Sequence, residues 1–324
     1  MSDDEHIVAD DAAIGSLYDD DDSSLGRDAA SESTSLKSSI MKYREENGRT
    51  YHAYKDGAYA LPNDEVENER LDLQHHLMLL TFDGKLHMTP LPRKLGRVFD
   101  VGCGTGIWAI EFADERPESE VVGVDLSPIQ PSVVPPNVTF YVDDIEEPWD
   151  YSAEFDFIFA RFLTGSIRDW PRFFKQSYEN LNAGGAIELI DCIYPMASDD
   201  DTLSTDSALY KWSKLLLDTF AAMGSPLDSA LRYKEQLEEA GFVDINIVKR
   251  KWPLNSWPKD PKYKQLGIWS YENGMNGLSA ASLAAFTRPK CQGGLGWSVD
   301  EVEVFLTDVR KDLKDVKIHA YCSM

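Results

Sequence analysis

Short apolar runs and amphipathic segments alternate along the middle of the chain. Between residues 97 and 190 the apolar runs occupy 98–101, 120–124, 138–142, 155–160 and 186–190. Helical patterns follow the first and the fourth of these runs, at 107–113 and 170–181. Strands that alternate with helices in this way are typical of a parallel sheet that carries helices on both faces.

The flanking segments predict further elements of both kinds. We expect a helix from Asn63 onward, because Asn63 can cap it, Glu65 and Glu67 suit its first turn, and Gly84 follows its end. Other patterns predict helices at 203–223, 233–240 and 299–313 and strands at 243–248 and 316–321. The two late strands would complete the sheet as a hairpin. The expected fold class is therefore α/β, a doubly wound, mostly parallel seven-stranded sheet with a helical insert.

The two ends of the chain differ from the middle in composition. The first 38 residues are rich in Asp and Ser and cannot bury enough surface to offset chain entropy, so we expect disorder. Residues 39–60 carry many aromatic side chains, and we expect this stretch to lie on the main domain as a lid. The tryptophan-rich stretch 252–298 would form part of the wall of a pocket. We divide the chain into an acidic tail (1–38), an N-terminal helical lid (39–95), an α/β core (96–195), and a helical insert with closing strands of the same domain (196–324).

The net charge of the 324-residue chain is −24 at pH 7, and it is unevenly spread. Residues 1–37 hold 11 acidic residues against Arg27 and Lys37, which gives this stretch −9 and leaves −15 for the rest. Such a chain repels phosphate backbones, so we expect no direct contact with nucleic acid. The four cysteines are widely spaced, as is typical of free thiols in a reducing compartment. Because we recognise neither a secretory leader nor an 18-residue apolar run, we expect a cytoplasmic or nuclear protein without a membrane span.

The first predicted strand runs into a glycine-rich turn. Gly102, Gly104 and Gly106 alternate with other residues before the next helix begins, and Asp100 lies inside the strand near its carboxyl end. Glycine suits a turn in which the backbone bends sharply and approaches a ligand, because a Cβ would block both. The turn alone leaves the ligand open, since the segment from Gly104 to Ala109 also satisfies the G-x-G-x-x-A form of a dinucleotide site.

Charged side chains end the other predicted strands. Asp125 ends the second, Asp143 and Asp144 the third, Arg161 the fourth and Asp191 the fifth. Ligands of parallel sheets bind outside the carboxyl ends of the strands, so we expect these side chains to share one crevice. Asp125 also follows the glycines by about 20 residues, where doubly wound folds place an acid that binds ribose hydroxyls. As the alternative, each aspartate could simply cap a turn.

Together these features resemble the class I S-adenosylmethionine (SAM) methyltransferases. Asp100 and the three glycines resemble their motif I, and Asp125 resembles their ribose-binding acid. Asp143-Asp144-Ile145 resembles the loop whose acid accepts from the adenine amino group. Leu181-Asn-Ala-Gly-Gly185 resembles their Leu-x-Pro-Gly-Gly turn, with Ala183 in place of proline. A nicotinamide enzyme would lack the last two landmarks, so the resemblance implies SAM as the cofactor and a Rossmann-like fold.

The resemblance also implies roles for individual residues. The three glycines, Gly102, Gly104 and Gly106, would admit the methionine part and the adenosine of SAM close to the backbone. Asp100 would hold the methionine ammonium through water. Asp125 would bind the ribose with Leu126 beside it, and Asp143 or Asp144 would bind the adenine amine with Ile145 against the ring.

Longer strings resemble a narrower group, the fungal LaeA-like methyltransferases of secondary metabolism. They include Tyr43-Arg-Glu-Glu-Asn-Gly-Arg-Thr-Tyr-His52, Leu71-Asp-Leu-Gln-His-His76, Asp125-Leu-Ser-Pro-Ile-Gln-Pro131 and Gly165-Ser-Ile-Arg-Asp-Trp170. The resemblance covers residues 40–190 well. The group mixes regulators of metabolite gene clusters with enzymes encoded inside such clusters. Relatives commonly have histidine where this chain has Phe159, so a catalytic histidine cannot act at that point.

Methyl transfer from a sulfonium needs little from the protein beyond alignment and a dry pocket, because the cofactor is already activated. A general base helps only when the acceptor is a poorly acidic hydroxyl or a protonated amine. His52 and Tyr51 in the lid are the candidates for a base or a positioning group. Arg161 could meet a carboxylate or an anionic acceptor, or could pair with a buried acid. We expect no metal, because the adjacent His75 and His76 point apart on a helix.

Three functions remain open on the sequence. The one we favour is transfer of a methyl group to an oxygen of a small-molecule acceptor in a fungal biosynthetic pathway, which the aromatic inserts suit. The second is a SAM-binding regulator that acts in the nucleus through protein partners, which the acidic tail and the missing histidine fit. The third is a protein or histone methyltransferase, which requires an open acidic groove.

Overall fold

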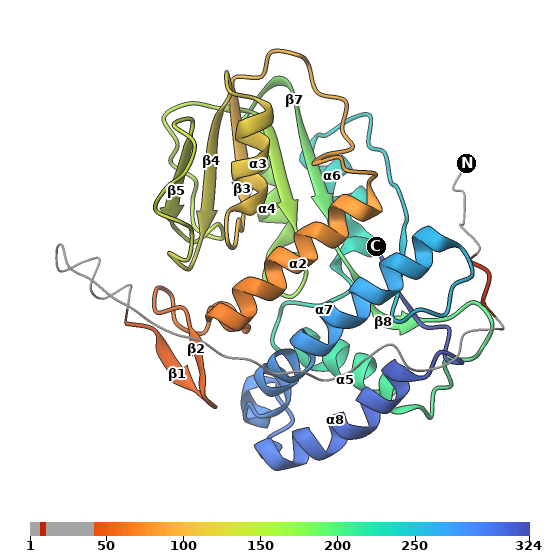
Figure 1. Ribbon diagram of the computed structural model, residues 1–324. Helices are drawn as coiled ribbons and strands as arrows, with labels where there is room; N and C mark the ends of the chain where they lie inside the picture. The colour runs from red at the N-terminus through yellow and green to blue at the C-terminus, as the bar shows by residue number, and fades with distance from the viewer. Residues whose placement is uncertain (1–6, 11–41) are drawn as a thin grey trace.

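The computed structural model describes residues 7–10 and 42–324. Figure 1 shows a parallel α/β unit beside a mostly helical unit, with the long helix α2 running across the boundary between them. The parallel sheet has the strand order β5-β4-β3-β6-β7. Its strands are β3 (Arg97–Val101), β4 (Glu120–Asp125), β5 (Val138–Val142), β6 (Phe155–Arg161) and β7 (Leu181–Ile190). Every ladder between them is parallel, which confirms the α/β fold class.

Helices cover both faces of this sheet, as the alternation of patterns predicts. On one face lies α3 (Ile107–Glu115), where Val98 of β3 joins Trp108 in one core cluster. On the other face lie α4 (Trp170–Glu179) and α6 (Tyr233–Ala240), where Phe99 of β3 packs in a second cluster. Consecutive strand residues point to opposite faces, and both faces are buried, so the strand is apolar without alternation.

The sheet is smaller than the seven strands that we expected. Within residues 42–324, a separate antiparallel sheet of order β8-β10-β9 contains β8 (Ile193–Ala197), β9 (Lys251–Pro253) and β10 (Tyr321–Ser323). Residues 243–248 form no strand, and most of their apolar side chains face solvent: Val243 is 80% exposed and Ile247 57%, whereas Ile245 packs against the core cluster of α4 and α6. The closing strand begins at Tyr321 rather than at 316, because a turn precedes it in which Ile318 donates a backbone hydrogen bond to Asp315 at 2.9 Å.

The helical unit packs around one large apolar cluster. It consists of α5 (Ala208–Ala222), α7 (Pro261–Phe286), α8 (Val299–Lys314) and the short 3-10 helices η1 (Ser229–Arg232) and η2 (Lys290–Gln292). The helix α5 begins at Ala208 rather than at 203, because Ser207 caps it. Sequence patterns missed α7, since its glycines at 267, 274 and 277 interrupt the pattern and each costs about 1 kcal/mol of helix stability relative to alanine.

The segment 39–95, expected to be a helical lid, contains a β-hairpin before its helix. The strands β1 (Arg44–Glu46) and β2 (Arg49–Tyr51) pair across Asn47-Gly48, whose positive φ angles are those that a tight hairpin turn favours. The helix α2 (Glu65–Thr81) follows, and its N-cap is Asp64 rather than Asn63. The Asp64 carboxylate also pairs with the Arg49 guanidinium, so the helix cap anchors the hairpin.

Residues 7–10 lie against the helical unit. Ala9 forms an antiparallel bridge with Pro258, and the backbone N–H of Lys259 donates to the carbonyl of Val8 at 2.8 Å. The Ile7 side chain is buried, with 6% exposed. The disordered tail expected over 1–38 does not describe residues 7–10, because the bridge and the burial of Ile7 give them a defined place. The remainder of that prediction, and the start of the lid at 39–41, lie outside the described residues.

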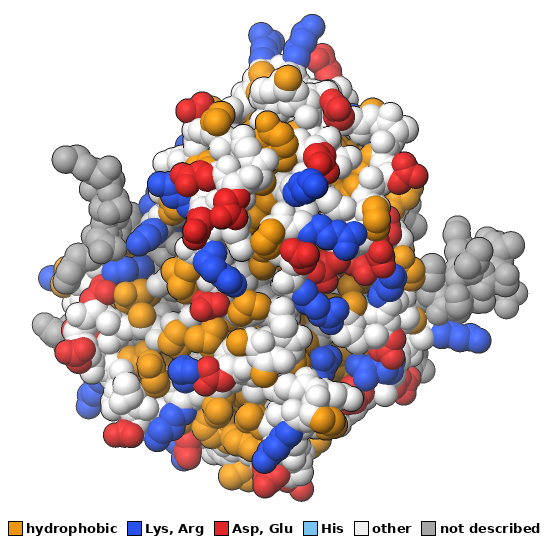
Figure 2. All heavy atoms as spheres, turned by 180° about the vertical axis from the view of Figure 1, so that it is seen from behind, with side chains coloured by type: hydrophobic (Ala, Val, Ile, Leu, Met, Phe, Trp, Pro, Cys, Tyr) orange, Lys and Arg blue, Asp and Glu red, His pale blue; other side chains and the backbone are white. Residues whose placement is uncertain are grey.

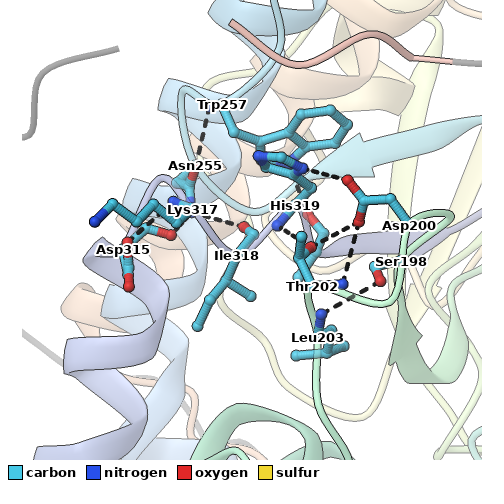
Figure 3. A network of polar contacts seen from close by, with 11 residues as sticks. Ser198, Asp200, Thr202, Leu203, Asn255, Trp257, Asp315, Lys317, Ile318 and His319 are labelled. Atoms are coloured by element: carbon cyan, nitrogen blue, oxygen red, sulfur yellow. Dashed lines mark hydrogen bonds and ion pairs between the residues drawn. The ribbon is translucent and has the colours of Figure 1, made fainter. Parts of the chain in front are cut away.

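A polar network joins the loop after β8 to the last turn before β10 (Figure 3). Thr202 donates to Asp200 Oδ1 at 2.7 Å, and the backbone N–H of His319 donates to Thr202 Oγ1 at 2.8 Å. The His319 ring contacts Asp200 and lies tilted against Trp257, with 5.0 Å between ring centroids and 31° between ring planes. This network fixes β10 beside β8, and both strands contribute walls to the cavity described below.

The surface carries charges of both signs. Figure 2 shows Lys and Arg side chains interspersed with Asp and Glu over the face opposite to that of Figure 1. The described residues of this face therefore present no extended basic patch of the kind that binds a phosphate backbone. No helix in the described part of the chain combines the length and the apolar character needed to cross a membrane.

Candidate active site

A cavity of about 330 Å³ opens at the carboxyl ends of the parallel strands. This is the position at which parallel α/β sheets bind their ligands. The strand-end part of the cavity is lined by Gly102, Gly104, Asp125, Asp143 and Arg161. The apolar part, walled mostly by the helical unit, is lined by Phe162, Trp212, Leu216, Phe220, Trp252 and Leu278. One continuous space thus joins a polar end to an apolar end.

The glycine turn after β3 requires glycine for two different reasons. Gly102, Gly104 and Gly106 all adopt positive φ, at +66°, +55° and +78°. The first two line the cavity, so their predicted role of admitting a cofactor stays a prediction that their position supports. Gly106 does not line it: an added Cβ there would lie 2.4 Å from Cζ of Phe140. Gly106 is therefore needed for packing rather than for ligand approach.

Asp125 is oriented by the glycine turn that it faces. Its Oδ2 accepts from the backbone N–H of Gly104 at 2.9 Å, and its Oδ1 accepts from that of Ser127 at 2.9 Å. Burial raises the pKa of Asp125, and these two hydrogen bonds oppose that rise. Each carboxylate oxygen can accept a further bond, so Asp125 can still receive two hydroxyls, as the ribose prediction requires. Leu126 also lines the cavity.

The acids after β5 combine a capping role with access to the cavity. Asp143 Oδ1 accepts from the backbone N–H of Asp144 at 2.8 Å, and Asp144 Oδ1 accepts from that of Glu146 at 3.0 Å. Asp143, Asp144 and Ile145 all line the cavity. The turn-capping alternative and the adenine-binding prediction are therefore compatible, because each carboxylate keeps a second oxygen. Asp144 Oδ2 lies 4.0 Å from Nζ of Lys55 in the lid.

Asp100 lies beneath the glycine turn rather than in the cavity wall. It is only 2% exposed, and its Oδ2 has no hydrogen-bond partner among the described residues. Burial raises the pKa of Asp100 to about 7, although the nearby Arg161 lowers it. A buried acceptor without a donor is satisfied by a cation or by a water molecule that leads to one. This geometry suits the predicted contact with the methionine ammonium through water.

Arg161 lines the cavity and is held from behind by a histidine. Its Nη1 donates to Nδ1 of His75 at 2.8 Å, and Nε2 of His75 lies 2.9 Å from Oε2 of Glu111. Because arginine only donates, Nδ1 of His75 must accept, so the ring proton is on Nε2 and points to Glu111. Burial and Arg161 both lower the pKa of His75. The sequence analysis considers His75 only to reject it as a metal ligand, because the sequence does not show that Arg161 faces the ring.

The lid candidates for a base do not reach the cavity. Neither His52 nor Tyr51 lines it, and they are 1% and 3% exposed. Nε2 of His52 lies 3.2 Å from the carbonyl oxygen of Lys55 and 3.4 Å from the backbone nitrogen of Tyr59, so the ring holds the lid loop together. Burial lowers the pKa of His52. This geometry does not support the prediction that His52 and Tyr51 act directly in catalysis. Tyr59, from the same segment, does line the cavity.

Phe159, where the family resemblance leads us to expect histidine, belongs to the core. It is 1% exposed and stacks on Trp108 with 3.8 Å between ring centroids and 5° between ring planes. It packs under α3 and does not line the cavity. A histidine at this position would meet Trp108, so its replacement by phenylalanine leaves the lining of the cavity unchanged.

Two polar residues that sequence reasoning missed tie the cofactor side to the lid. Gln130 donates from Nε2 to the carbonyl of Gly104 at 2.6 Å and to that of Ser127 at 3.0 Å. Asn63 donates from Nδ2 to Oγ of Ser127 at 3.2 Å. The loop after β4 therefore connects the glycine turn to the segment that precedes α2. In the sequence, Gln130 could have been noticed only as a polar residue within the proline-rich stretch 128–136.

The thiols carry no metal site in the described part of the chain. All four cysteines are free, and Cys103, Cys192 and Cys322 line the cavity. Among residues 7–10 and 42–324, no group of three or more His, Cys, Asp or Glu side chains is placed to hold a metal ion.

The parallel sheet, the glycine turn and the acids at the ends of β3, β4 and β5 define a class I SAM-dependent methyltransferase. The residues fit the cofactor, because Gly104 is open to the cavity, Asp125 keeps acceptor capacity, and the buried oxygen of Asp100 lacks a donor. SAM, when bound, supplies a methyl group carried on a positively charged sulfur atom. The chain would contribute the orientation of the cofactor and a largely apolar space beside it.

The chain belongs to the Methyltransferase domain family, whose model matches residues 73–247. It is 40% identical to Methyltransferase pytC of Aspergillus terreus, over 90% of this chain and 89% of that protein. It is 35% identical to Probable methyltransferase tdiE of Emericella nidulans, over 87% of each chain. It is 39% identical to Secondary metabolism regulator LAE1 of Cochliobolus heterostrophus, over 85% of this chain and 91% of that protein. The resemblance to fungal secondary-metabolism methyltransferases and LaeA regulators is thereby confirmed.

Proposed function

We propose that the protein transfers the methyl group of SAM to an acidic hydroxyl of a small, largely apolar molecule of fungal secondary metabolism. The observation that carries this proposal is the continuity of the cavity from its strand-end part to its apolar part. Methyl transfer requires cofactor and acceptor to share one water-poor space. Apolar walls such as Phe162, Trp212 and Trp252 suit a hydrophobic acceptor.

The ionisable residues of the lining favour an acceptor that ionises without help. No histidine or lysine is among the described residues that line the cavity. Glu67 is held by an ion pair with Arg70, and burial raises the pKa values of Tyr59 and Tyr194. A phenol or an enol needs little help from a base, unlike an aliphatic alcohol or a protonated amine. We therefore place the acceptor among compounds with acidic hydroxyls.

A regulatory function is the second candidate, and the similarity to LAE1 favours it. Such a protein could bind SAM and act in the nucleus through protein partners. The apolar part of the cavity gives the enzyme more support, because a regulator that works only through its surface has no use for such a space. A protein methyltransferase gains less support, since its peptide substrate would require an open groove.

Calorimetric titration of SAM into the wild type, Asp125→Ala and Asp114→Ala tests the cofactor site. Asp114 is an exposed acid on α3, so its variant controls for the loss of one negative charge. We expect Asp125→Ala to weaken SAM by at least about tenfold, since hydrogen bonds to a charged group contribute roughly 1.5–3 kcal/mol. Asp114→Ala should bind as the wild type does.

Turnover then separates the enzyme from the regulator. The wild type with SAM and a panel of phenols and enols should form methyl ethers, detected by mass spectrometry, and Asp125→Ala should lose most of this activity. A folded wild type that does not bind SAM contradicts the proposal at its first step. SAM binding without turnover of any small acceptor would support the regulatory candidate instead.

A further inference from the structure

The apolar part of the cavity contains a charged group that the proposed function leaves unexplained. Arg70 of α2 lines the cavity and is 8% exposed. Its Nη1 donates to Oδ1 of Asn273 in α7 at 2.9 Å. Figure 1 shows α2 and α7 side by side, so this contact joins two helices that are distant in the sequence. A buried arginine at such a junction is costly unless its N–H groups find acceptors.

The contacts of Arg70 use only part of its hydrogen-bonding capacity. The Nε–H group is shared between the two carboxylate oxygens of Glu67, at 3.1 and 3.0 Å, and Nη2 donates to Oε1 of Glu67 at 2.6 Å. With the bond to Asn273, three of the five N–H groups of the guanidinium are occupied. The other two, on Nη1 and Nη2, have no acceptor within residues 7–10 and 42–324. They are the donors that a molecule in the cavity can meet.

Two glycines of α7 shape the space beside Arg70. An added Cβ at Gly277 would lie 3.2 Å from Cδ of Arg70 and 3.6 Å from its Nε, so glycine lets the side chain cross the helix closely. An added Cβ at Gly274 would meet no heavy atom within 4 Å, although Gly274 lines the cavity. Glycine in a helix interior lowers stability. Glycine at position 274 therefore lowers the stability of the free protein. The space that it leaves open can be filled by a bound molecule.

The charges of the Glu67–Arg70 pair favour a neutral oxygen ligand over an anionic one. Glu67 is 2% exposed and compensates the charge of Arg70, so the pair is neutral as a whole. An anionic ligand would approach the Glu67 carboxylate as well as Arg70, whereas a carbonyl oxygen accepts from N–H groups without adding charge. Aromatic walls of the same cavity, Trp212 and Trp252, suit a flat ring system.

We propose that the methyl acceptor is a flat, apolar molecule with a ketone or related carbonyl group. Its ring lies over Gly274, and its carbonyl oxygen accepts from Arg70. This inference rests on the proposed function and specifies the substrate class of the same site. A carbonyl conjugated with a hydroxyl also makes that hydroxyl more acidic, which agrees with a lining that lacks histidine and lysine among its described residues.

The helix α2 places this subsite next to the cofactor side. Leu71, the residue after Arg70, has its Cδ1 3.4 Å from the position of an added Cβ at Gly104. The next residue, Asp72, accepts from Oγ1 of Thr105 at 2.7 Å. Consecutive residues of α2 therefore contact the carbonyl subsite and the glycine turn. A molecule bound to Arg70 would border the cofactor, as a methyl acceptor must.

Two matched probes test the carbonyl subsite. 2-Hydroxy-9-fluorenone and 2-hydroxyfluorene share a flat ring and a hydroxyl and differ in the carbonyl. Binding is followed by quenching of tryptophan fluorescence, because Trp212 and Trp252 line the cavity, in protein with and without saturating S-adenosylhomocysteine. The wild type should prefer the ketone by about tenfold. The double variant Glu67→Gln/Arg70→Gln removes both charges together and should lose this preference.

A second pair of variants keeps the test independent of the buried ion pair. Gly274→Leu fills the open space and should weaken both probes by at least about tenfold. Asn276→Leu is the matched control, because Asn276 is exposed on the same helix, and it should leave both affinities within about twofold. Equal affinities of the wild type for the two probes, or probe binding unaffected by Gly274→Leu, would overturn the carbonyl subsite. Failure of S-adenosylhomocysteine itself to bind would instead overturn the proposed function.

Discussion

The guanidinium of Arg161 donates to Nδ1 of His75 at 2.8 Å, and this contact fixes His75 as a neutral ring. Nε2 of the same ring faces Oε2 of Glu111 at 2.9 Å, so the histidine links the cavity wall to α3. Protonation of Nδ1 would place a second N–H against the guanidinium and a second positive charge beside it. The folded state therefore resists protonation of His75, in agreement with a pKa lowered by burial and by Arg161.

This relationship predicts a specific pH dependence of stability. As the pH falls below about 6.5, the unfolded chain takes up a proton at His75 before the folded protein does, so the free energy of unfolding decreases. The decrease ends below the lowered folded pKa and cannot exceed about 1.4 kcal/mol per pH unit for one group. His75→Asn keeps an acceptor for Arg161 but does not titrate, so denaturant unfolding between pH 7.5 and 5.5 should show a shallower slope.

The neighbouring histidine provides the control for this prediction. His76 is exposed on the same helix, and His76→Asn should keep the wild-type slope. If the two variants change the slope equally, the contact between His75 and Arg161 does not control the titration, and the assigned tautomer is wrong.

The glycine turn predicts a contrast between two glycines with nearly equal backbone angles. Gly106 has φ +78° and Gly84 has φ +80°, but an added Cβ would meet Cζ of Phe140 at 2.4 Å only at Gly106. Gly84→Ala should cost about 1 kcal/mol of unfolding free energy, from the left-handed conformation alone. Gly106→Ala should cost about 3 kcal/mol or more, because overpacking adds to that strain. Similar costs in thermal or urea unfolding would show that Phe140 moves aside freely.

The sequence predicted the parts of this molecule that follow from local periodicity. Five apolar runs became the parallel strands, and the charged residues at their ends, Asp125 and Arg161 among them, reached one cavity. This works because a strand buried on both faces is continuously apolar, and because parallel strands end at one edge of the sheet. Candidate residues for the cofactor side therefore follow from the order of strands and charged residues alone.

The remaining parts depend on contacts between distant segments. The helix α7 was missed because the glycines that fit Arg70 and Asn255 weaken its helical pattern. His52 looked catalytic because sequence shows that a histidine is present and not which way it faces, and it lies buried behind the cavity wall. The sequence did not single out Arg70, because its pairing with Glu67 is an ordinary i,i+3 contact of a helix, whereas Asn273 reaches it only in the folded protein.

The lid should respond to the ion pair that joins it to the loop after β5. Lys55, shortly after the hairpin, pairs with Glu147 in the loop after β5, and both side chains are exposed. We expect Lys55→Glu to accelerate dissociation of SAM by about threefold in stopped-flow measurements at low salt, with a smaller effect at high salt because ions screen the pair. The charge-swapped double variant Lys55→Glu/Glu147→Lys should restore the wild-type rate. Lys214→Glu, which breaks an exposed pair with Asp218 on α5, should have no effect. A double variant as fast as the single one would show that the pair does not hold the lid.

Two adjacent residues near the start of the chain decide whether the first segment contributes to the fold. Ile7 is 6% exposed, whereas Val8 is 58% exposed, so the two differ in burial although the bridge between Ala9 and Pro258 holds both in place. Removing the Ile7 side chain should cost about 2 kcal/mol of unfolding free energy, at the low end for a buried aliphatic residue. Val8→Ala should leave stability nearly unchanged. Urea unfolding of Ile7→Ala, Val8→Ala and the wild type measures the difference. A disordered first segment predicts no loss in either variant, so equal stability of all three would restore the tail interpretation for residues 7–10.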